Sequence, residues 1–233
     1  MTFKRTKVAD RLPDFPWDSL TEAKAKATSH PDGIVDLSVG TPVDPVSPAI
    51  QLALTESAAE PGYPQTKGTK ELREAIVGAM ERRFQVRGLD ADTQVLPVIG
   101  TKEAIAWMPT LLGIGAGHTV VIPELAYPTY EVSARLAGAD VLRSDSLLKL
   151  GPQTPALIYL NSPANPHGQV LGVDHLRKFV EFARERGTII VSDECYLGLG
   201  WGEERPVSIL DPEVCGGDFT NLIAVHSLSK TSN

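Results

Sequence analysis

The sequence predicts an α/β fold, with a mostly parallel sheet covered by helices on both faces. Short apolar runs alternate along the chain with segments of helical periodicity, the pattern of parallel strands joined by helices. The runs are apolar throughout, as expected of strands that are buried on both sides. Polar and aromatic residues follow directly after these runs, where ligands bind in such sheets.

Five apolar runs are expected to form the strands. They are residues 95–99, 119–122, 156–160, 188–191 and 222–225. Pro97 lies inside the first run and cannot donate a ladder hydrogen bond, so we place that strand at an edge or a bulge of the sheet.

Four segments are expected to be helical. They are residues 18–28, 69–84, 101–112 and 174–186. In the last segment, apolar residues recur at helical spacing, Asp174 is expected to cap the first amides, and Gly187 is expected to end the helix. Pro109 is a possible kink in the third segment.

The chain divides into an irregular N-terminal arm or small-domain segment, residues 1–33, and a larger domain, residues 34–233. A formal charge of −7 argues against a nucleic-acid surface, and no apolar run approaches the ~18 residues that a membrane span needs. The two cysteines form no disulfide framework and no metal-binding motif, so we expect a cytoplasmic protein without a structural metal.

Four residues near the ends of apolar runs carry the chemistry. Lys230 follows the last run, Asp193 and Tyr196 follow the run before it, and Asn165 follows the run at 156–160. Pyridoxal phosphate needs an amine, a carboxylate for its pyridine nitrogen, and donors for its oxygens. The set therefore predicts a pyridoxal phosphate site, although each residue alone has a bland alternative as a surface lysine, a turn or cap residue, or core packing.

Two further features fit the same cofactor. Gly100 precedes a predicted helix, whose free amides would attract a phosphate, and Tyr127 could cover a flat ring. A rival interpretation is an acyl-transfer enzyme, because Ser227 and Lys230 satisfy an SxxK motif. That motif needs a later KTG-like element, and the sequence shows none after Lys230.

Taken together, these residues resemble the fold type I, class I/II aminotransferases. The matching elements, in family order, are Gly40-Thr41-Pro42, Tyr63-Pro64 with Gly68, Gly100-Thr101-Lys102-Glu103-Ala104, Tyr127-Pro128, Asn165-Pro166 with Gly168, Asp193-Glu194-Cys195-Tyr196 and Ser227-Leu228-Ser229-Lys230. They cover nearly the whole chain, and the last three sets together are specific.

The resemblance implies a role for each matching position. It makes Lys230 the Schiff-base lysine and proton shuttle, and Asp193 the partner of the pyridine nitrogen. Asn165 and Tyr196 would bind the phenolic oxygen of the cofactor, and Tyr127 would stack on its ring. Thr101, Lys102 and Ser227 would bind the phosphate. Tyr63 would reach the phosphate of the partner subunit in a homodimer. Gly40 and Asn165 would lie beside the substrate carboxylate.

The resemblance also implies the reaction, the transfer of an amino group from an amino acid to a 2-oxo acid with pyridoxal 5'-phosphate as cofactor. The chain is similar to the actinobacterial N-succinyldiaminopimelate aminotransferases, which suggests N-succinyl-LL-diaminopimelate and 2-oxoglutarate as substrates in lysine biosynthesis. Another amino acid aminotransferase, a β-lyase of the same fold and a non-catalytic cofactor-binding sensor remain alternatives.

Family members continue beyond this lysine. They have an arginine that grips the phosphate and a C-terminal small domain whose arginine pairs with the substrate carboxylate. The sequence stops at Asn233 without either, so we expect an incomplete large domain that lacks the small domain. Residues 1–233 alone are expected to fold poorly and to transaminate little.

Overall fold

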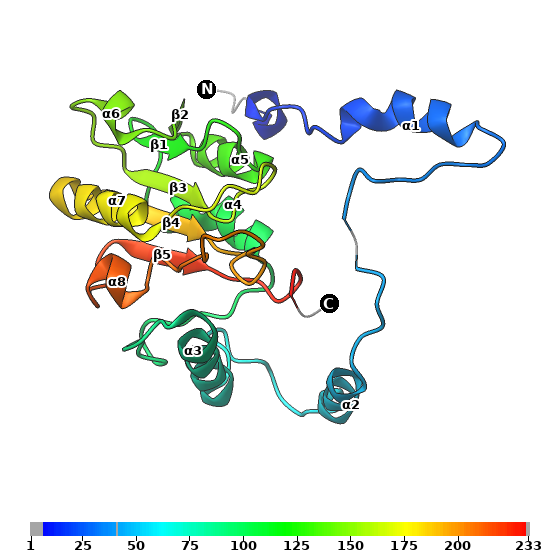
Figure 1. Cartoon of the computed structure of the whole chain (residues 1–233), viewed down its shortest axis with the longest axis horizontal. Helices are drawn as coiled ribbons and strands as arrows, with labels where there is room; N and C mark the ends of the chain where they lie inside the picture. Colours follow the sequence, from blue (N-terminus) through cyan, green and yellow to red (C-terminus); the bar gives the residue numbers. More distant parts are fainter. Residues whose placement is uncertain (1–6, 41, 232–233) are drawn as a thin grey trace, which may run out of the picture.

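The computed structural model describes residues 7–40 and 42–231 and confirms the predicted α/β architecture with a parallel sheet (Figure 1). The strands are β1 (Thr119–Ile122), β2 (Asp140–Arg143), β3 (Leu157–Asn161), β4 (Ile189–Asp193) and β5 (Leu222–Val225). Their order in the sheet is β2-β1-β3-β4-β5, and every neighbouring pair is parallel.

Helices of very different length connect and cover the strands. The α-helices are α1 (Thr21–Thr28), α2 (Pro48–Ser57), α3 (Lys70–Phe84), α4 (Thr101–Leu111), α5 (Pro128–Ala137), α6 (Leu147–Leu150), α7 (Val173–Arg186) and α8 (Pro212–Cys215). Two 3₁₀ turns, η1 (Val8–Arg11) and η2 (Asp18–Leu20), precede α1.

Two apolar cores, one on each face, hold the sheet between its helices. Val121, Ile158 and Ile190 face a core that includes side chains of α3, α7 and α8. Their strand neighbours Val120 and Leu157 face a second core formed with α4 and α5. Because successive side chains of a strand point to opposite faces, a run that is apolar throughout supplies both cores.

Helix α7 shows how local chemistry sets the ends of an element. Its N-cap is Gly172, so the expected cap by Asp174 is wrong; the Asp174 side chain instead accepts a hydrogen bond from Arg177 at 2.9 Å. Gly187 ends the helix in the left-handed region, at φ 68°, as expected. The other helix predictions are confirmed within a few residues, and α4 continues through Pro109.

The expected strand at 95–99 is wrong, because this segment forms no strand in the structure. Leu96, Val98 and Ile99 are 64%, 48% and 97% exposed, so the run is apolar without being covered. Conversely, β2 was not predicted. Its two middle residues, Val141 and Leu142, are half-buried and its charged end residues, Asp140 and Arg143, are exposed, because the strand lies at the edge of the sheet.

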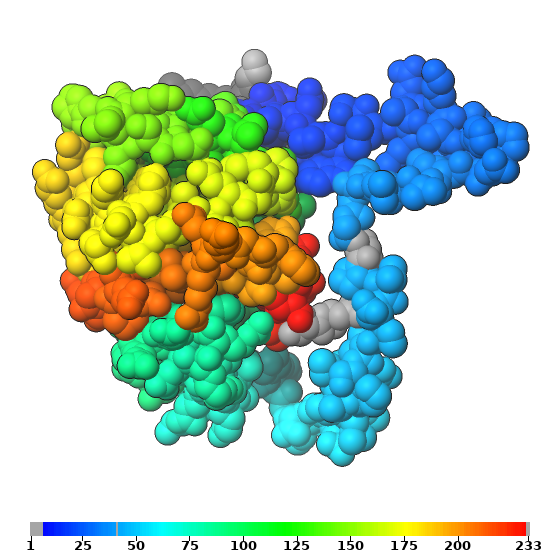
Figure 2. All heavy atoms as spheres, viewed as in Figure 1, coloured from blue at the N-terminus to red at the C-terminus, as the bar shows by residue number. Residues whose placement is uncertain are grey.

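The turn η1 lies against α5, but the chain from α1 to α2 stands clear of the sheet, as the lighter blue and cyan parts of Figures 1 and 2 show. Helices α1 and α2 contain no buried residue. Apolar side chains between and beyond them are exposed, including Val35 at 85%, Leu37 at 88% and Val43 at 93%. Within residues 7–40 and 42–231, no helix has the length and apolarity to cross a membrane.

Arg73 of α3 is a charged residue that this fold buries almost completely, at 2% exposure. It donates hydrogen bonds to the carbonyl oxygens of Ala91 at 2.8 Å and Gly68 at 2.7 Å, and to Asp92 at 2.8 Å. The guanidinium therefore ties α3 to the loops on either side of it.

Replacing Arg73 by Met should lower the free energy of unfolding by about 2–3 kcal/mol, because two carbonyl groups lose their donor. Urea unfolding of the full-length protein measures this. Lys70→Met is the matched control: Lys70 is exposed and forms a surface ion pair with Glu74 at 3.6 Å, so a change below about 0.5 kcal/mol is expected. Equal losses in both variants would contradict the structural role of Arg73.

Candidate active site

The ends of β3, β4 and β5 meet at one edge of the sheet. Asn161 pairs with Asp193 in the β3–β4 ladder, and Asp193 pairs with Val225 in the β4–β5 ladder. The Asn161 side chain reinforces this alignment: its amide donates to the carbonyl oxygen of Asp193 at 2.9 Å, and its oxygen accepts from the Asn165 amide at 2.7 Å. The loops that carry Asn165, Tyr196 and Lys230 therefore start side by side.

Asp193 is a buried carboxylate, 6% exposed, whose hydrogen bonds come from neutral groups. The hydroxyl of Tyr130 donates to its Oδ2 at 2.7 Å, and the amide of Cys195 donates to its Oδ1 at 3.2 Å. In the described part of the chain it forms no ion pair with a lysine, arginine or histidine. A buried anion without a counter-charge is costly, so the position fits a protonated pyridine nitrogen.

The groups around Asp193 are held in their protonated forms. Burial, followed by the charge of Asp193, raises the pKa of the Tyr130 hydroxyl far above its usual value. Burial also raises the pKa of the Cys195 thiol to about 12, and Asp193 adds to this shift. At neutral pH both groups therefore remain neutral, and Tyr130 keeps the proton that it donates to Asp193.

Tyr196 joins Asn165 and Lys230 in one cluster. Burial raises the pKa of the Tyr196 hydroxyl, whereas a side-chain hydrogen bond with Asn165 lowers it. The Lys230 Nζ lies 5.9 Å from the centre of the Tyr196 ring, although Lys230 itself is exposed. Asn165 and Tyr196 also line a cleft of about 720 Å³ whose opposite wall is the 199–204 loop. The fold thus brings Asp193, Asn165, Tyr196 and Lys230 to the same edge of the sheet.

The start of α4 reaches this edge as well. The Cys195 thiol lies 3.6 Å from the Thr101 hydroxyl and donates to it. Gly100 is the N-cap of α4, and a Cβ at Gly100 would meet no atom within 4 Å. The first amides of the helix are therefore open to an anion, as the phosphate prediction requires.

The other predicted phosphate residues have different surroundings. The Ser227 hydroxyl lies 2.7 Å from the Ser229 hydroxyl and accepts from the Ser229 amide at 3.2 Å, so its loop folds onto itself. Lys102 is exposed, and its Nζ lies 4.8 Å from the centre of the Phe15 ring in the N-terminal arm. Its contact is thus to the arm rather than to a residue of the cluster.

Two predicted residues lie apart from the cluster. Tyr63 is 100% exposed, and Gly40 is exposed with no atom within 4 Å of a Cβ built on it. Thr41, which belongs to the same motif as Gly40, lies outside the described residues. Tyr127 is half-buried at the start of α5, with its ring 6.1 Å from that of Tyr130 in an edge-on contact.

Sequence reasoning missed two residues that position this site, Tyr130 and Asn161. Tyr130 lies on α5, three residues after Tyr127, and its ring also stacks on Tyr159 at 4.9 Å. The only signal for it was a second tyrosine one helical turn after the first. Asn161, a polar residue at the end of an apolar run, could have been selected by the same rule that selected Asp193.

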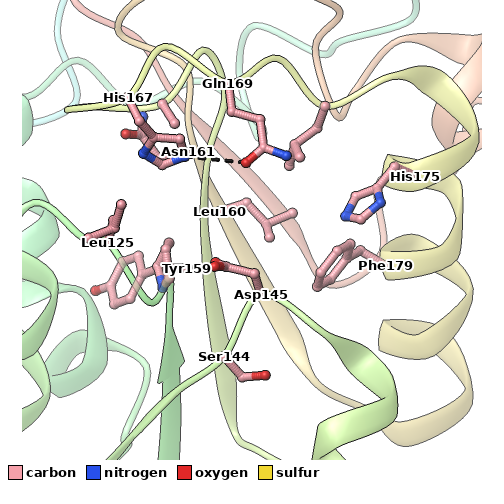
Figure 3. Close-up of a pocket in the computed structure, with 13 residues that line it drawn as sticks. Leu125, Ser144, Asp145, Tyr159, Leu160, Asn161, His167, Gln169, His175 and Phe179 are labelled. Atoms are coloured by element: carbon pink, nitrogen blue, oxygen red, sulfur yellow. Dashed lines mark hydrogen bonds between the residues drawn. The ribbon is translucent and has the colours of Figure 1, made fainter.

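A separate, smaller cavity of about 70 Å³ lies between the β3 end and α7 (Figure 3). Asp145, His175 and Phe179 line it, and His167 and Gln169 form a hydrogen bond of 3.2 Å at its rim. The residues predicted to hold the cofactor do not line it. The chemistry predicted from the sequence therefore belongs to the cluster around Asp193, and not to this cavity.

A parallel α/β sheet with a lysine, a buried aspartate and a helix N-terminus at one edge fits the class of pyridoxal phosphate-binding proteins of fold type I. Residues 32–233 match the family described as aminotransferase class I and II, and the chain belongs to that family. Class I/II aminotransferases of this fold use pyridoxal 5'-phosphate, which agrees with the uncompensated carboxylate and the open helix N-terminus found here.

Relatives with curated names extend beyond this chain. A probable aminotransferase of Mycobacterium tuberculosis is 66% identical over 98% of the chain and 54% of its own length. The 4-dedimethylamino-4-oxo-anhydrotetracycline transaminase of Streptomyces rimosus is 52% identical over 95% of the chain and 61% of its own length. The LL-diaminopimelate aminotransferase of Dehalococcoides mccartyi is 31% identical over 99% and 62%. The chain thus spans somewhat more than half the length of these relatives.

Solved structures show the same fold. An aminotransferase from Neisseria meningitidis superposes with a TM-score of 0.85 and 30% identity, over 97% of this chain and 62% of that one. The N-succinyldiaminopimelate aminotransferase from Mycobacterium tuberculosis superposes with a TM-score of 0.78 over 98% and 60%, at 24% identity. The second comparison supports the fold alone.

Replacing Tyr130 by Phe should lower the free energy of unfolding by about 1.5–3 kcal/mol at neutral pH, because an ionised, buried Asp193 loses a donor. Tyr159→Phe is the matched control, since the Tyr159 hydroxyl donates to the neutral carbonyl oxygen of Ile105 at 3.1 Å and about 0.5–1.5 kcal/mol is expected. Urea unfolding of both full-length variants gives the comparison. A smaller loss for Tyr130→Phe than for Tyr159→Phe would contradict an ionised Asp193.

Proposed function

We propose that the full-length protein is an aminotransferase that moves an amino group from an amino acid to a 2-oxo acid. The observation that carries this proposal is the shared position of Asp193 and Lys230. Asp193 ends β4, and Lys230 follows the neighbouring strand β5. The ring of Tyr196, three residues after Asp193, lies 5.9 Å from the Lys230 Nζ. One ring can therefore meet the carboxylate at one end and the amine at the other.

The residues present fit the cofactor, and each has a defined task. When bound, pyridoxal 5'-phosphate supplies an electron sink for the carbanion formed at the amino acid Cα. Asp193 would keep the pyridine nitrogen protonated, and Asn165 and Tyr196 would donate to the phenolic oxygen. Lys230 would link to the cofactor at rest and then, once released, carry the Cα proton as a general base and acid.

The phosphate and the ring have separate supports. The open amides at the start of α4 and the hydroxyls of Thr101 and Ser227 would hold the phosphate, with the positive end of the helix dipole behind them. Lys102 would have to leave Phe15 to join them. Tyr127 would cover the ring from the α5 side, where its own contact with Tyr130 leaves it half-buried.

For the substrate, we propose a diaminopimelate derivative, N-succinyl-LL-diaminopimelate, with 2-oxoglutarate as acceptor in lysine biosynthesis. The LL-diaminopimelate aminotransferase among the relatives supports this choice. The Streptomyces rimosus relative, named for an anhydrotetracycline substrate, is more similar to this chain and marks the main competitor. Two values of kcat/KM decide between the two, one for N-succinyl-LL-diaminopimelate as amino donor with 2-oxoglutarate, and one for the 4-oxo-anhydrotetracycline compound as amino acceptor with an amino acid donor.

We also propose a homodimer in the cytoplasm. Tyr63 and the apolar side chains of the N-terminal segment, such as Leu37 and Val43, are exposed in the single chain and would be covered by a second copy. The cysteines, Cys195 and Cys215, are both free, which suits a reducing compartment. Tyr63 would then reach the phosphate bound in the partner subunit.

Incubating the full-length enzyme with an amino donor alone should convert the bound cofactor to pyridoxamine phosphate, seen as a loss of its visible absorbance. The variant Lys230→Ala should slow this half-reaction by at least about 10²-fold, because the proton carrier is lost. Lys178→Ala, a change at an exposed lysine on α7, is the control and should leave the rate unchanged. Release of ammonia and a 2-oxo acid without pyridoxamine phosphate would instead indicate a lyase.

Mixing two inactive variants tests the shared site. Tyr63→Ala and Lys230→Ala homodimers should each be impaired, whereas subunit exchange between them creates dimers with one complete site. Random exchange should restore roughly a quarter of wild-type activity, because half of the dimers are mixed and each has one of two sites intact. No recovery, in mixtures shown by mass spectrometry to contain mixed dimers, would contradict a contribution of Tyr63 across the interface.

A further inference from the structure

A second buried carboxylate, Glu194, lies directly after Asp193. Its side chain is 1% exposed, and its Oε1 accepts a hydrogen bond from the Ile209 amide at 2.7 Å. Its Oε2 lies 3.0 Å from the Nε2 of His226. The two atoms are within ion-pair distance, but the angles between their groups do not fit a hydrogen bond. Neither atom has another hydrogen-bond partner among the described residues.

His226 is held in place from another direction. Its ring stacks on Phe84, the last residue of α3, with centres 5.4 Å apart and planes inclined by 25°. Its side chain is 25% exposed, so the imidazole is partly shielded from water while it faces the carboxylate. A buried carboxylate with one neutral donor is costly unless a neighbouring group compensates it, and the His226 ring lies 3.0 Å from the oxygen of Glu194 that lacks such a donor.

The pair joins the two segments that carry the predicted cofactor residues. Glu194 is adjacent to Asp193, and His226 is adjacent to Ser227. The β4–β5 ladder ends where the Glu194 amide donates to the carbonyl oxygen of Val225 at 2.9 Å. Beyond that point the described chain has no further backbone hydrogen bond between the segments, so side-chain contacts link them there, and the Glu194–His226 pair is the shortest polar one.

We propose that Glu194 and His226 are positioning residues, whose ion pair fixes the Asp193–Tyr196 segment relative to the Ser227–Lys230 segment. The inference rests on the cofactor role proposed for these segments. In this proposal the pair sets the distance between the Asp193–Tyr196 segment, which binds the cofactor ring, and the Ser227–Lys230 segment, which binds the phosphate and supplies the amine. A shift of either segment would weaken cofactor binding and slow the proton transfers without changing any residue that touches the cofactor.

The test is a double-mutant cycle in the full-length protein. His226→Phe keeps an aromatic ring against Phe84 but leaves the Glu194 charge uncompensated. Glu194→Gln keeps the shape of the side chain and the acceptor for Ile209 but removes the charge. We expect His226→Phe to raise the Kd of the apo protein for pyridoxal 5'-phosphate by about tenfold or more, and the double variant to bind more tightly than His226→Phe alone.

Three readouts separate positioning from simple stability. They are the cofactor Kd from absorbance titration, kcat and KM determined separately, and the free energy of unfolding of the apo protein. If the pair positions the two segments, kcat should fall by a larger factor than the KM for the amino donor rises. The cofactor Kd should also change by more than the loss of apo-protein stability explains. If His226→Phe does not fold, His226→Gln and His226→Ala replace it in the test. The His226→Gln variant, whose amide can donate to Glu194, should retain more of the wild-type affinity for the cofactor than His226→Ala.

Additive effects in the cycle, or Kd values that follow apo stability in every variant, would overturn the inference. Equal Kd values in all four proteins would do the same while leaving the proposed function intact. If the wild-type protein binds no pyridoxal 5'-phosphate, the proposed function itself fails. The two failures are therefore distinguishable within one set of proteins.

Discussion

The register of three parallel strands is the constraint on which the candidate site depends. Asn161, Asp193 and Val225 lie opposite one another at the ends of β3, β4 and β5. Because backbone hydrogen bonds fix this register, the loops that follow leave the sheet at the same level. A slip of one residue would turn Asp193 to the opposite face of the sheet, away from Tyr130 and the start of α4.

At the same edge of the sheet, the surrounding residues that the structure describes supply hydrogen bonds to the Asp193 carboxylate but do not neutralise its charge. Tyr130 and the Cys195 amide supply hydrogen bonds to Asp193, but both are neutral. Burial keeps Tyr130 and the Cys195 thiol protonated, so neither becomes a competing anion beside Asp193. A buried carboxylate with only neutral donors costs stability, and the ring nitrogen of the proposed cofactor would compensate its charge, as expected where function and packing compete.

Sequence reasoning succeeded where one local pattern decides the structure. The apolar run before Asp193 and the helical stripe before Gly187 were predicted because burial on both faces or on one stripe leaves a clear signal. The edge strand β2 left none, since its exposed residues are charged. Tyr130 could not be assigned to Asp193 either, because the contact joins residues 63 positions apart and depends on how α5 packs on the sheet.

The adjacent carboxylates Asp193 and Glu194 show how the sheet sorts similar groups into different tasks. Successive side chains at a strand end point to opposite faces. Asp193 therefore meets Tyr130 from α5, whereas Glu194 meets Ile209 and His226 near the end of α3. Among the described residues, Asp193 accepts hydrogen bonds from neutral donors and remains available to a cationic ligand, whereas Glu194 lies at ion-pair distance from a histidine of the protein itself. The alternation of the strand, more than the chemistry of either side chain, decides which carboxylate faces the proposed cofactor site.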